Sequence, residues 1–153
     1  AKKEKVDKLV IQDIKLAAWL HDVGYIWEPN RHEARGAEYA TSILTEMKFP
    51  KSKISLITGM IMATKIPQSP KNQFEQILCD ADLDYLGRDD YAVNSHNLLK
   101  EIELTKKLSE KEWLLLQEKF LKAHAYFTNT SQKLRNPSKQ ATLKSIQQQI
   151  KIK

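Results

Sequence analysis

The sequence has few of the residues that interrupt helices or cross-link chains. Its 153 residues include four glycines, five prolines and a single cysteine, Cys79. One cysteine excludes a disulfide bond within the chain, and this favours a reducing compartment, so we expect a cytoplasmic protein. The apolar neighbours of Cys79 predict a small buried side chain rather than a nucleophile. No apolar run approaches the roughly 18 residues that a membrane-spanning helix needs, so we expect no membrane segment in this chain.

Strand patterns are also missing from the sequence. Strict alternation of apolar and polar residues does not occur, whereas apolar residues recur at spacings of three and four, and this predicts an all-α fold. The length suffices for one domain with its own core. The helices that we expect run over residues 3–22, from 30 to near 50, from 52 to the loop at 67–70, over 72–86, over 91–103, from 109 to about 124, and over 138–151.

Several residues predict where these helices begin and end. Gly24 is typical of a helix C-terminal stop. Asn30 with Glu33 three residues later, and the stretch 109–112 with Ser109 and Glu112 at its ends, have the spacing of a capping box. Pro137 is expected to break the chain before the last helix.

The charge balance is basic, with 25 lysines and arginines against 19 acidic residues and a formal net charge of +6. Such a balance favours anionic partners such as phosphate esters and nucleotides. A solvated basic surface is the alternative explanation. The lysines are spread along the whole chain, without an arginine-rich run or a basic patch interleaved with aromatic residues. The sequence therefore does not favour a nucleic-acid partner.

A His-Asp pair ends the apolar segment over residues 16–20. His21 follows Val10, Ile14 and Ala17 at helical spacing, which places it on the buried stripe of its helix. The neighbouring carboxylate of Asp22 is costly to bury unless it is paired or binds a metal ion. The pair is therefore either half of a metal site or a hydrogen-bonded histidine followed by a turn residue.

A second acidic segment lies on the helix expected over residues 72–86. Asp82 is four residues from Leu78 and next to Ala81, which puts it on the apolar face. Asp80 is turned away from Asp82 by about 200°. The spacing therefore predicts that Asp82 is the buried carboxylate, with Asp80 as the runner-up and as a residue that supports Asp82 by hydrogen bonding.

Three stretches together resemble the HD superfamily of metal-dependent phosphohydrolases. They are Leu16–Tyr25 with its His-Asp pair, the stretch His32–Ala37, and Ile77–Gly87 with its Asp-Ala-Asp sequence. The resemblance covers roughly residues 6 to 90. It implies a helical bundle of the HD type, formed by residues 1–153 as a single domain. The family also has an upstream histidine, and no histidine precedes His21, so we expect the domain to be N-terminally incomplete here.

The resemblance also implies a chemistry. His21, Asp22 and Asp82 are implied as ligands of a divalent metal ion, with Mn, Mg, Fe, Ni, Co and Zn all compatible with the ligand types. Asp22 would bridge two metals or orient the attacking water. The implied reaction is hydrolysis of a small phosphate ester, a nucleotide or a cyclic nucleotide. The alternative is a regulatory module that keeps the HD fold and binds nucleotides or other anions with little or no turnover.

His32 and Lys65 are further candidates for catalysis. By resemblance, His32 would bind a second metal ion or a substrate phosphate. The simpler interpretation is an exposed histidine on the first turn of a helix. Lys65 lies where some family members carry another metal-binding histidine. By this resemblance, the lysine would bind a substrate phosphate. The alternative interpretation is an ordinary surface lysine.

Three arginines are candidates for binding the substrate. Arg31 and Arg35 flank His32 at a helix N-terminus, which favours anions. Arg88 follows the helix that carries Asp82. The sequence does not specify the oligomeric state.

Overall fold

The computed structural model describes residues 1–152 and confirms the all-α prediction. This part of the chain contains seven α-helices and four short 3-10 helices, labelled η, and no β-strand. The contacts divide the chain into two compact units, Ala1–Asp82 and Leu83–Lys153, and each is described by itself. Within the described residues, no helix is both long enough and apolar enough to cross a membrane.

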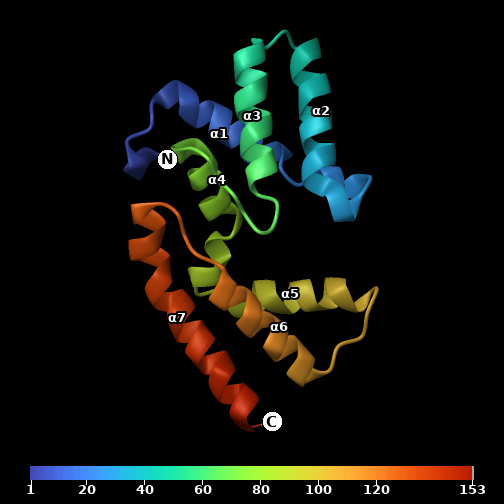
Figure 1. Cartoon of the computed structure of the whole chain (residues 1–153), viewed down its shortest axis with the longest axis vertical. Helices are drawn as coiled ribbons and strands as arrows, with labels where there is room; N and C mark the ends of the chain where they lie inside the picture. The colour runs from blue at the N-terminus through green and yellow to red at the C-terminus, as the bar shows by residue number, and fades with distance from the viewer. Residues whose placement is uncertain (153) are drawn as a thin grey trace. The chain divides into compact units, whose positions relative to one another are not determined.

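The first unit is built around helix α3. Its elements are η1 (Lys2–Glu4), α1 (Lys8–Leu20), η2 (Val23–Ile26), η3 (Pro29–Arg31), α2 (His32–Glu46), α3 (Lys51–Ala63) and α4 (Gln73–Asp82). Helix α3 packs against α1, α2 and α4, and α2 runs beside it in Figure 1. The apolar core that joins these helices includes Ile14, Ala17, Leu44, Ile57, Ile61 and Leu78.

Two predicted helix ends in the first unit are wrong. Helix α1 ends at Leu20, and Gly24 does not adopt a left-handed conformation. The capping box of Asn30 and Glu33 does not form, because α2 begins at His32 after a short 3-10 turn and has no side-chain cap. The carboxylate of Glu33 lies instead beside the ring of His32, at 3.3 Å from Nε2. Glu33 therefore contacts the side chain of His32 instead of the backbone N–H of Asn30, which a capping box would use.

The second unit contains η4 (Asp84–Gly87), α5 (Tyr91–Glu103), α6 (Glu110–Ala123) and α7 (Asn129–Ile152). The predicted bounds of α5 are confirmed, and the capping box of Ser109 and Glu112 is present at the start of α6. The helix predicted over residues 72–86 ends earlier, at Asp82, and a 3-10 turn follows it. Helix α7 packs against α6 and η4 around a core that includes Leu86, Leu114, Leu121, Tyr126, Leu143 and Ile146.

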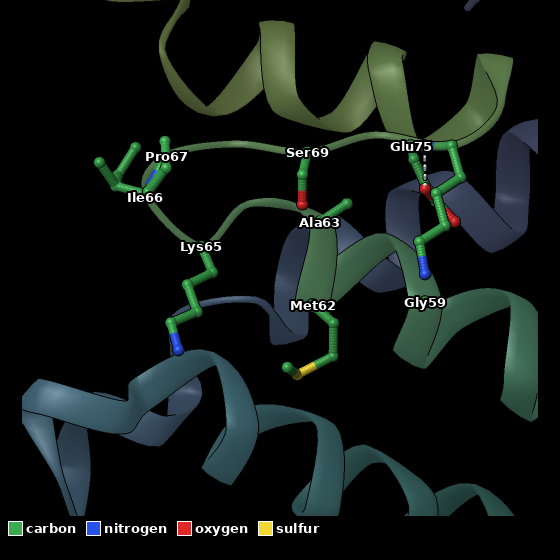
Figure 2. A pocket seen from close by; sticks show the side chains of 9 residues that line it. Gly59, Met62, Ala63, Lys65, Ile66, Pro67, Ser69 and Glu75 are labelled. Carbon is green, nitrogen blue, oxygen red and sulfur yellow. Dashed lines mark hydrogen bonds between the residues drawn. The ribbon is translucent and has the colours of Figure 1, made fainter.

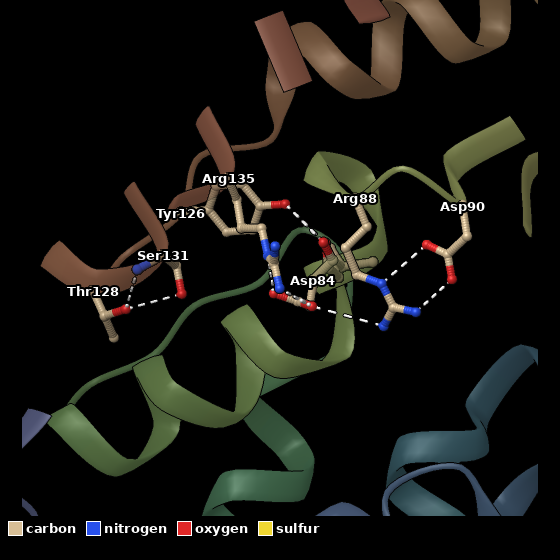
Figure 3. Close-up of polar contacts among 8 residues, drawn as sticks. Asp84, Arg88, Asp90, Tyr126, Thr128, Ser131 and Arg135 are labelled. Atoms are coloured by element: carbon tan, nitrogen blue, oxygen red, sulfur yellow. Dashed lines mark hydrogen bonds and ion pairs between the residues drawn. The ribbon is translucent and has the colours of Figure 1, made fainter. Parts of the chain in front are cut away.

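Pro137 does not break the chain, contrary to the prediction. It lies inside α7, which runs without interruption to Ile152. Proline in a helix interior costs about 3 kcal/mol through a lost hydrogen bond and a steric clash. Contacts on both sides of Pro137 stabilise α7 and offset this cost. Arg135 donates two hydrogen bonds to Asp84, at 2.6 and 3.0 Å, and Leu143 is buried in the core. Figure 3 shows the Arg135–Asp84 pair beside Tyr126.

Candidate metal centre

His21 lies directly after α1, with its two ring nitrogens in different surroundings. Its Nδ1 is 2.8 Å from the carbonyl oxygen of Ala18. Its Nε2 is 3.3 Å from Asp22 Oδ2 and 3.3 Å from Asp82 Oδ1. A carbonyl partner fixes the proton on Nδ1 of the neutral ring and leaves the Nε2 lone pair facing the carboxylates. The structure thus brings together the three residues that the sequence nominated.

His32 is oriented in the same way. Its Nδ1 is 2.9 Å from the carbonyl oxygen of Pro29, and its Nε2 is 3.7 Å from Asp22 Oδ1. The ring of Tyr25 stacks on that of His32 with 3.9 Å between centroids. Asp22 therefore has one carboxylate oxygen beside each histidine. His32 is not the exposed surface residue of the simpler interpretation, because only 18% of its side chain is accessible.

Two glycines allow α2 to approach the end of α1. A Cβ atom on Gly24 would lie 2.0 Å from the carbonyl oxygen of His32. A Cβ atom on Gly36 would lie 3.1 Å from the carbonyl oxygen of Leu20. These backbone contacts hold the first turn of α2 against the residues around the His-Asp pair. Gly24 is thus needed for close packing rather than for ending a helix.

The prediction that Asp82 is more buried than Asp80 is wrong. Asp80 is 3% exposed, whereas the side chain of Asp82 is 20% exposed. Asp82 is the last residue of α4, whereas Asp80 lies one half-turn inside the helix. Asp82 is nevertheless the aspartate that contacts His21.

Gln68 is a site residue that sequence reasoning missed. Its amide nitrogen donates to Asp82 Oδ2 at 3.1 Å and to the carbonyl oxygen of Cys79 at 3.3 Å. It comes from the loop between α3 and α4, where a lone glutamine between two prolines matches no motif. With Gln68 on Oδ2 and His21 on Oδ1, both oxygens of Asp82 have a fixed neighbour.

The carboxylates change the acid–base properties of the pair. Burial by itself would lower the pKa of His21, but the hydrogen bond to Asp82 and the charge of Asp22 outweigh it and raise this pKa to about 9. The pKa of Asp22 is also raised, because burial and the negative charge of Asp82 outweigh the favourable effect of His21. In the absence of another cation, a proton on His21 offsets the negative charge of the site.

The candidate phosphate-binding side chains lie in different places. Arg35 donates to Glu28 at 2.8 Å and to Glu38 at 2.7 Å, and Arg31 lies 3.7 Å from Glu28. Both guanidinium groups on this side of α2 therefore already have carboxylate partners.

Lys65 lines a pocket of about 360 Å³ in the first unit, together with Met62, Ser69 and Lys71 (Figure 2). Arg88 belongs to the second unit, where it forms ion pairs with Asp90 and Asp84 (Figure 3).

The donor atoms suit a divalent cation in type, and such a cation would take the place of the proton on His21. Imidazole nitrogen and carboxylate oxygen bind Zn, Mn, Fe, Co and Ni, and the carbonyl partner of each Nδ1 is what metal-binding histidines usually have. The two distances of 3.3 Å are close to the roughly 3.4 Å between neighbouring donors around a tetrahedral ion with bonds of about 2.1 Å. As the side chains are placed, residues 1–152 contain no group of three or more His, Cys, Asp or Glu residues that would hold a metal ion.

Comparisons with known proteins do not assign the chain to a family. No family model, no curated protein and no solved structure matches it.

Proposed function

We propose that this protein is a divalent-metal-dependent phosphohydrolase of the HD type that cleaves a small phosphate ester, either a nucleotide or a cyclic nucleotide. The observation that carries the proposal is the position of His21 Nε2, 3.3 Å from a carboxylate oxygen of Asp22 and 3.3 Å from one of Asp82. His21 and Asp22 follow α1 and Asp82 ends α4, and imidazole nitrogen and carboxylate oxygen are common ligands of catalytic metal ions.

Each residue has a role that follows from its surroundings. His21, Asp22 and Asp82 would hold the cation. A bound divalent cation supplies Lewis acidity, which lowers the pKa of water and offsets charge on phosphate oxygens. Asp22 is the most exposed of the three, with 55% of its side chain accessible. Its Oδ1 faces His32 rather than His21, so Asp22 and His32 can together orient a water molecule or receive its proton.

The charge of the site explains why a cation is needed before a phosphate binds. Asp22, Asp82 and Glu33 all lie beside the two histidines. Without a divalent cation these carboxylates repel an anionic substrate. Chelation should therefore abolish substrate binding as well as turnover. Among the candidate phosphate-binding residues, we assign this role to Lys65, because the guanidinium groups of Arg31 and Arg35 are already paired with glutamates.

The test combines metal analysis with a substrate panel. The purified chain is treated with Mn²⁺, Mg²⁺, Fe²⁺, Ni²⁺, Co²⁺ or Zn²⁺, and hydrolysis of p-nitrophenyl phosphate, bis-p-nitrophenyl phosphate, nucleotides and cyclic nucleotides is measured. We expect turnover with at least one ion and none after chelation. Asp82→Asn should remove both metal and turnover, whereas Glu46→Gln, which neutralises an exposed carboxylate on α2, should change neither.

Two results would count against the proposal. Turnover that survives chelation and Asp82→Asn would place the chemistry elsewhere. Nucleotide binding without hydrolysis under every metal condition would favour the alternative of a regulatory module with an HD-type fold.

A further inference from the structure

An open cavity of about 690 Å³ lies at the surface of the second unit, between α5, α6 and α7. Its wall includes Tyr91 and Ser95 of α5, Trp113 and Gln117 of α6, and Thr142 and Ile146 of α7. The volume falls within the range of about 300–1,000 Å³ that is typical of small-molecule sites. None of these residues takes part in the candidate metal centre.

The cavity exists because α5 is not packed in the usual way. An amphipathic helix ordinarily buries an apolar stripe. Among the thirteen residues of α5 the buried one is Ser95, a polar residue, whereas Val93 and Leu98 are 63% and 39% exposed. Leu99 of α5 is half-buried and lines the cavity, but the space between α5, α6 and α7 stays open.

A polar cluster of Tyr91, Ser95 and Gln117 forms part of the wall. Gln117 Oε1 accepts hydrogen bonds from the Tyr91 hydroxyl at 2.9 Å and from Ser95 Oγ at 2.7 Å, which uses both of its lone pairs. The amide nitrogen of Gln117 has only a long contact, 3.5 Å to the carbonyl oxygen of Trp113. The cluster therefore retains donor capacity at Gln117 and acceptor capacity at the two hydroxyl oxygens.

This pattern specifies the chemistry of a ligand. A group that satisfies the cluster carries an acceptor for the Gln117 amide next to a donor for Tyr91 or Ser95. The edges of nucleobases have such adjacent donors and acceptors. Two aromatic residues, Tyr91 and Trp113, line the same cavity, as suits a planar ring.

The remaining wall suits a sugar more than a phosphate. Helix α7 contributes Thr142, Ser145 and Gln149, whose hydroxyl and amide groups can bind pentose hydroxyls. The charged residues include the carboxylates of Asp89 and Glu110. The guanidinium of Arg88 is already paired with Asp90. A negative charge on the ligand is therefore not favoured.

We propose that the cavity between α5, α6 and α7 binds a neutral nucleoside through its base. The inference is independent of the proposed hydrolase activity, since it rests on residues of the second unit only. It gives the protein a second ligand site in addition to the candidate metal centre.

The test is a titration of the ¹⁵N-labelled full chain with adenosine and with uridine, followed by amide and indole NMR signals. We expect saturable shifts at Tyr91, Ser95, Gln117 and the Trp113 indole, and a weaker response to AMP than to adenosine. Gln117→Leu should weaken binding by about tenfold or more, because the half-buried amide donor is lost. Gln140→Leu, the same change at an exposed position of α7, should leave binding unchanged.

A second variant keeps the test informative if Gln117→Leu impairs folding. Ala141 is an exposed residue of α7 that lines the cavity, so Ala141→Trp should fill the space and abolish the shifts without disturbing the core. The inference is overturned if neither nucleoside shifts these signals at millimolar concentration. It is also overturned if binding persists in Ala141→Trp, or if AMP binds the cavity more tightly than adenosine.

Discussion

Gln68 donates a hydrogen bond of 3.1 Å to Asp82 Oδ2, on the opposite carboxylate oxygen from the one that faces His21. The same amide nitrogen lies 3.3 Å from the carbonyl oxygen of Cys79, which ties the loop after α3 to the end of α4. Gln68 thus fixes the orientation of a carboxylate at the point where its helix ends.

The first prediction concerns this orientation. Gln68→Leu should weaken divalent-metal affinity by about 10- to 100-fold, as is usual when a hydrogen-bond partner of a metal ligand is removed. The measurement is isothermal titration with Mn²⁺ or Zn²⁺, with far-UV circular dichroism to verify the fold. Gln12→Leu, at an exposed position of α1, is the matched control. Unchanged affinity in Gln68→Leu would mean that Asp82 is held in place without the amide.

The second prediction concerns the backbone contact between Gly24 and α2. Gly24→Ala would place a Cβ atom 2.0 Å from the carbonyl oxygen of His32, so the first turn of α2 must move. We expect the free energy of unfolding to fall by at least about 2 kcal/mol, measured by urea denaturation.

Gly59 provides the control for this prediction. A Cβ atom there would have an ordinary contact, 3.4 Å from Glu75 Oε1, in the interior of α3. Gly59→Ala should therefore stabilise the protein by roughly 0.5–1 kcal/mol through its higher helix propensity. Equal effects of the two substitutions would contradict the packing role of Gly24.

The third prediction concerns the pair of Arg135 and Asp84 in the second unit. Two parallel hydrogen bonds, at 2.6 and 3.0 Å, link η4 to α7 ahead of Pro137. Arg135→Lys keeps the charge but loses the paired geometry, and we expect a loss of about 1–2 kcal/mol in stability. Amide hydrogen exchange should show the loss in the first half of α7. Arg31→Lys should have little effect, because its contact with Glu28 is exposed and 3.7 Å long. Unaltered exchange in Arg135→Lys would show that Pro137 is accommodated without this pair.

The fourth prediction concerns the thiol of Cys79. Burial, together with the charges of Asp82 and Asp80, raises its pKa to about 12. The folded protein should therefore react with iodoacetamide far more slowly than the urea-unfolded chain at pH 8 to 9. Because the folded pKa lies above the ordinary value of 9.0, the stability that the protonated thiol contributes is fully present below pH 9 and is lost as the pH rises towards 12. Rapid labelling of the folded chain at pH 8 would show that the thiol is accessible.

Local patterns predicted much of the secondary structure. The bounds of α5 and the capping box of Ser109 and Glu112 depend on residues close together in the sequence, and both predictions are confirmed. The same kind of reasoning failed at Asn30 and Pro137. At Asn30 a 3-10 turn precedes α2 and Glu33 contacts the neighbouring ring of His32, and at Pro137 a packed helix outweighs the local preference, which is worth only about 1–3 kcal/mol.

The sequence by itself determined that the chain is helical and that a histidine and an aspartate stand at the end of an apolar segment, because helical periodicity and local caps follow from neighbouring residues. Only the tertiary structure decided that His32 lies 3.7 Å from Asp22 and that Gln68 donates a hydrogen bond to Asp82. These contacts join residues of different elements. The contact between His32 and Asp22 depends on how closely α2 approaches the end of α1, and Gly24 and Gly36 allow that approach because they lack a Cβ atom.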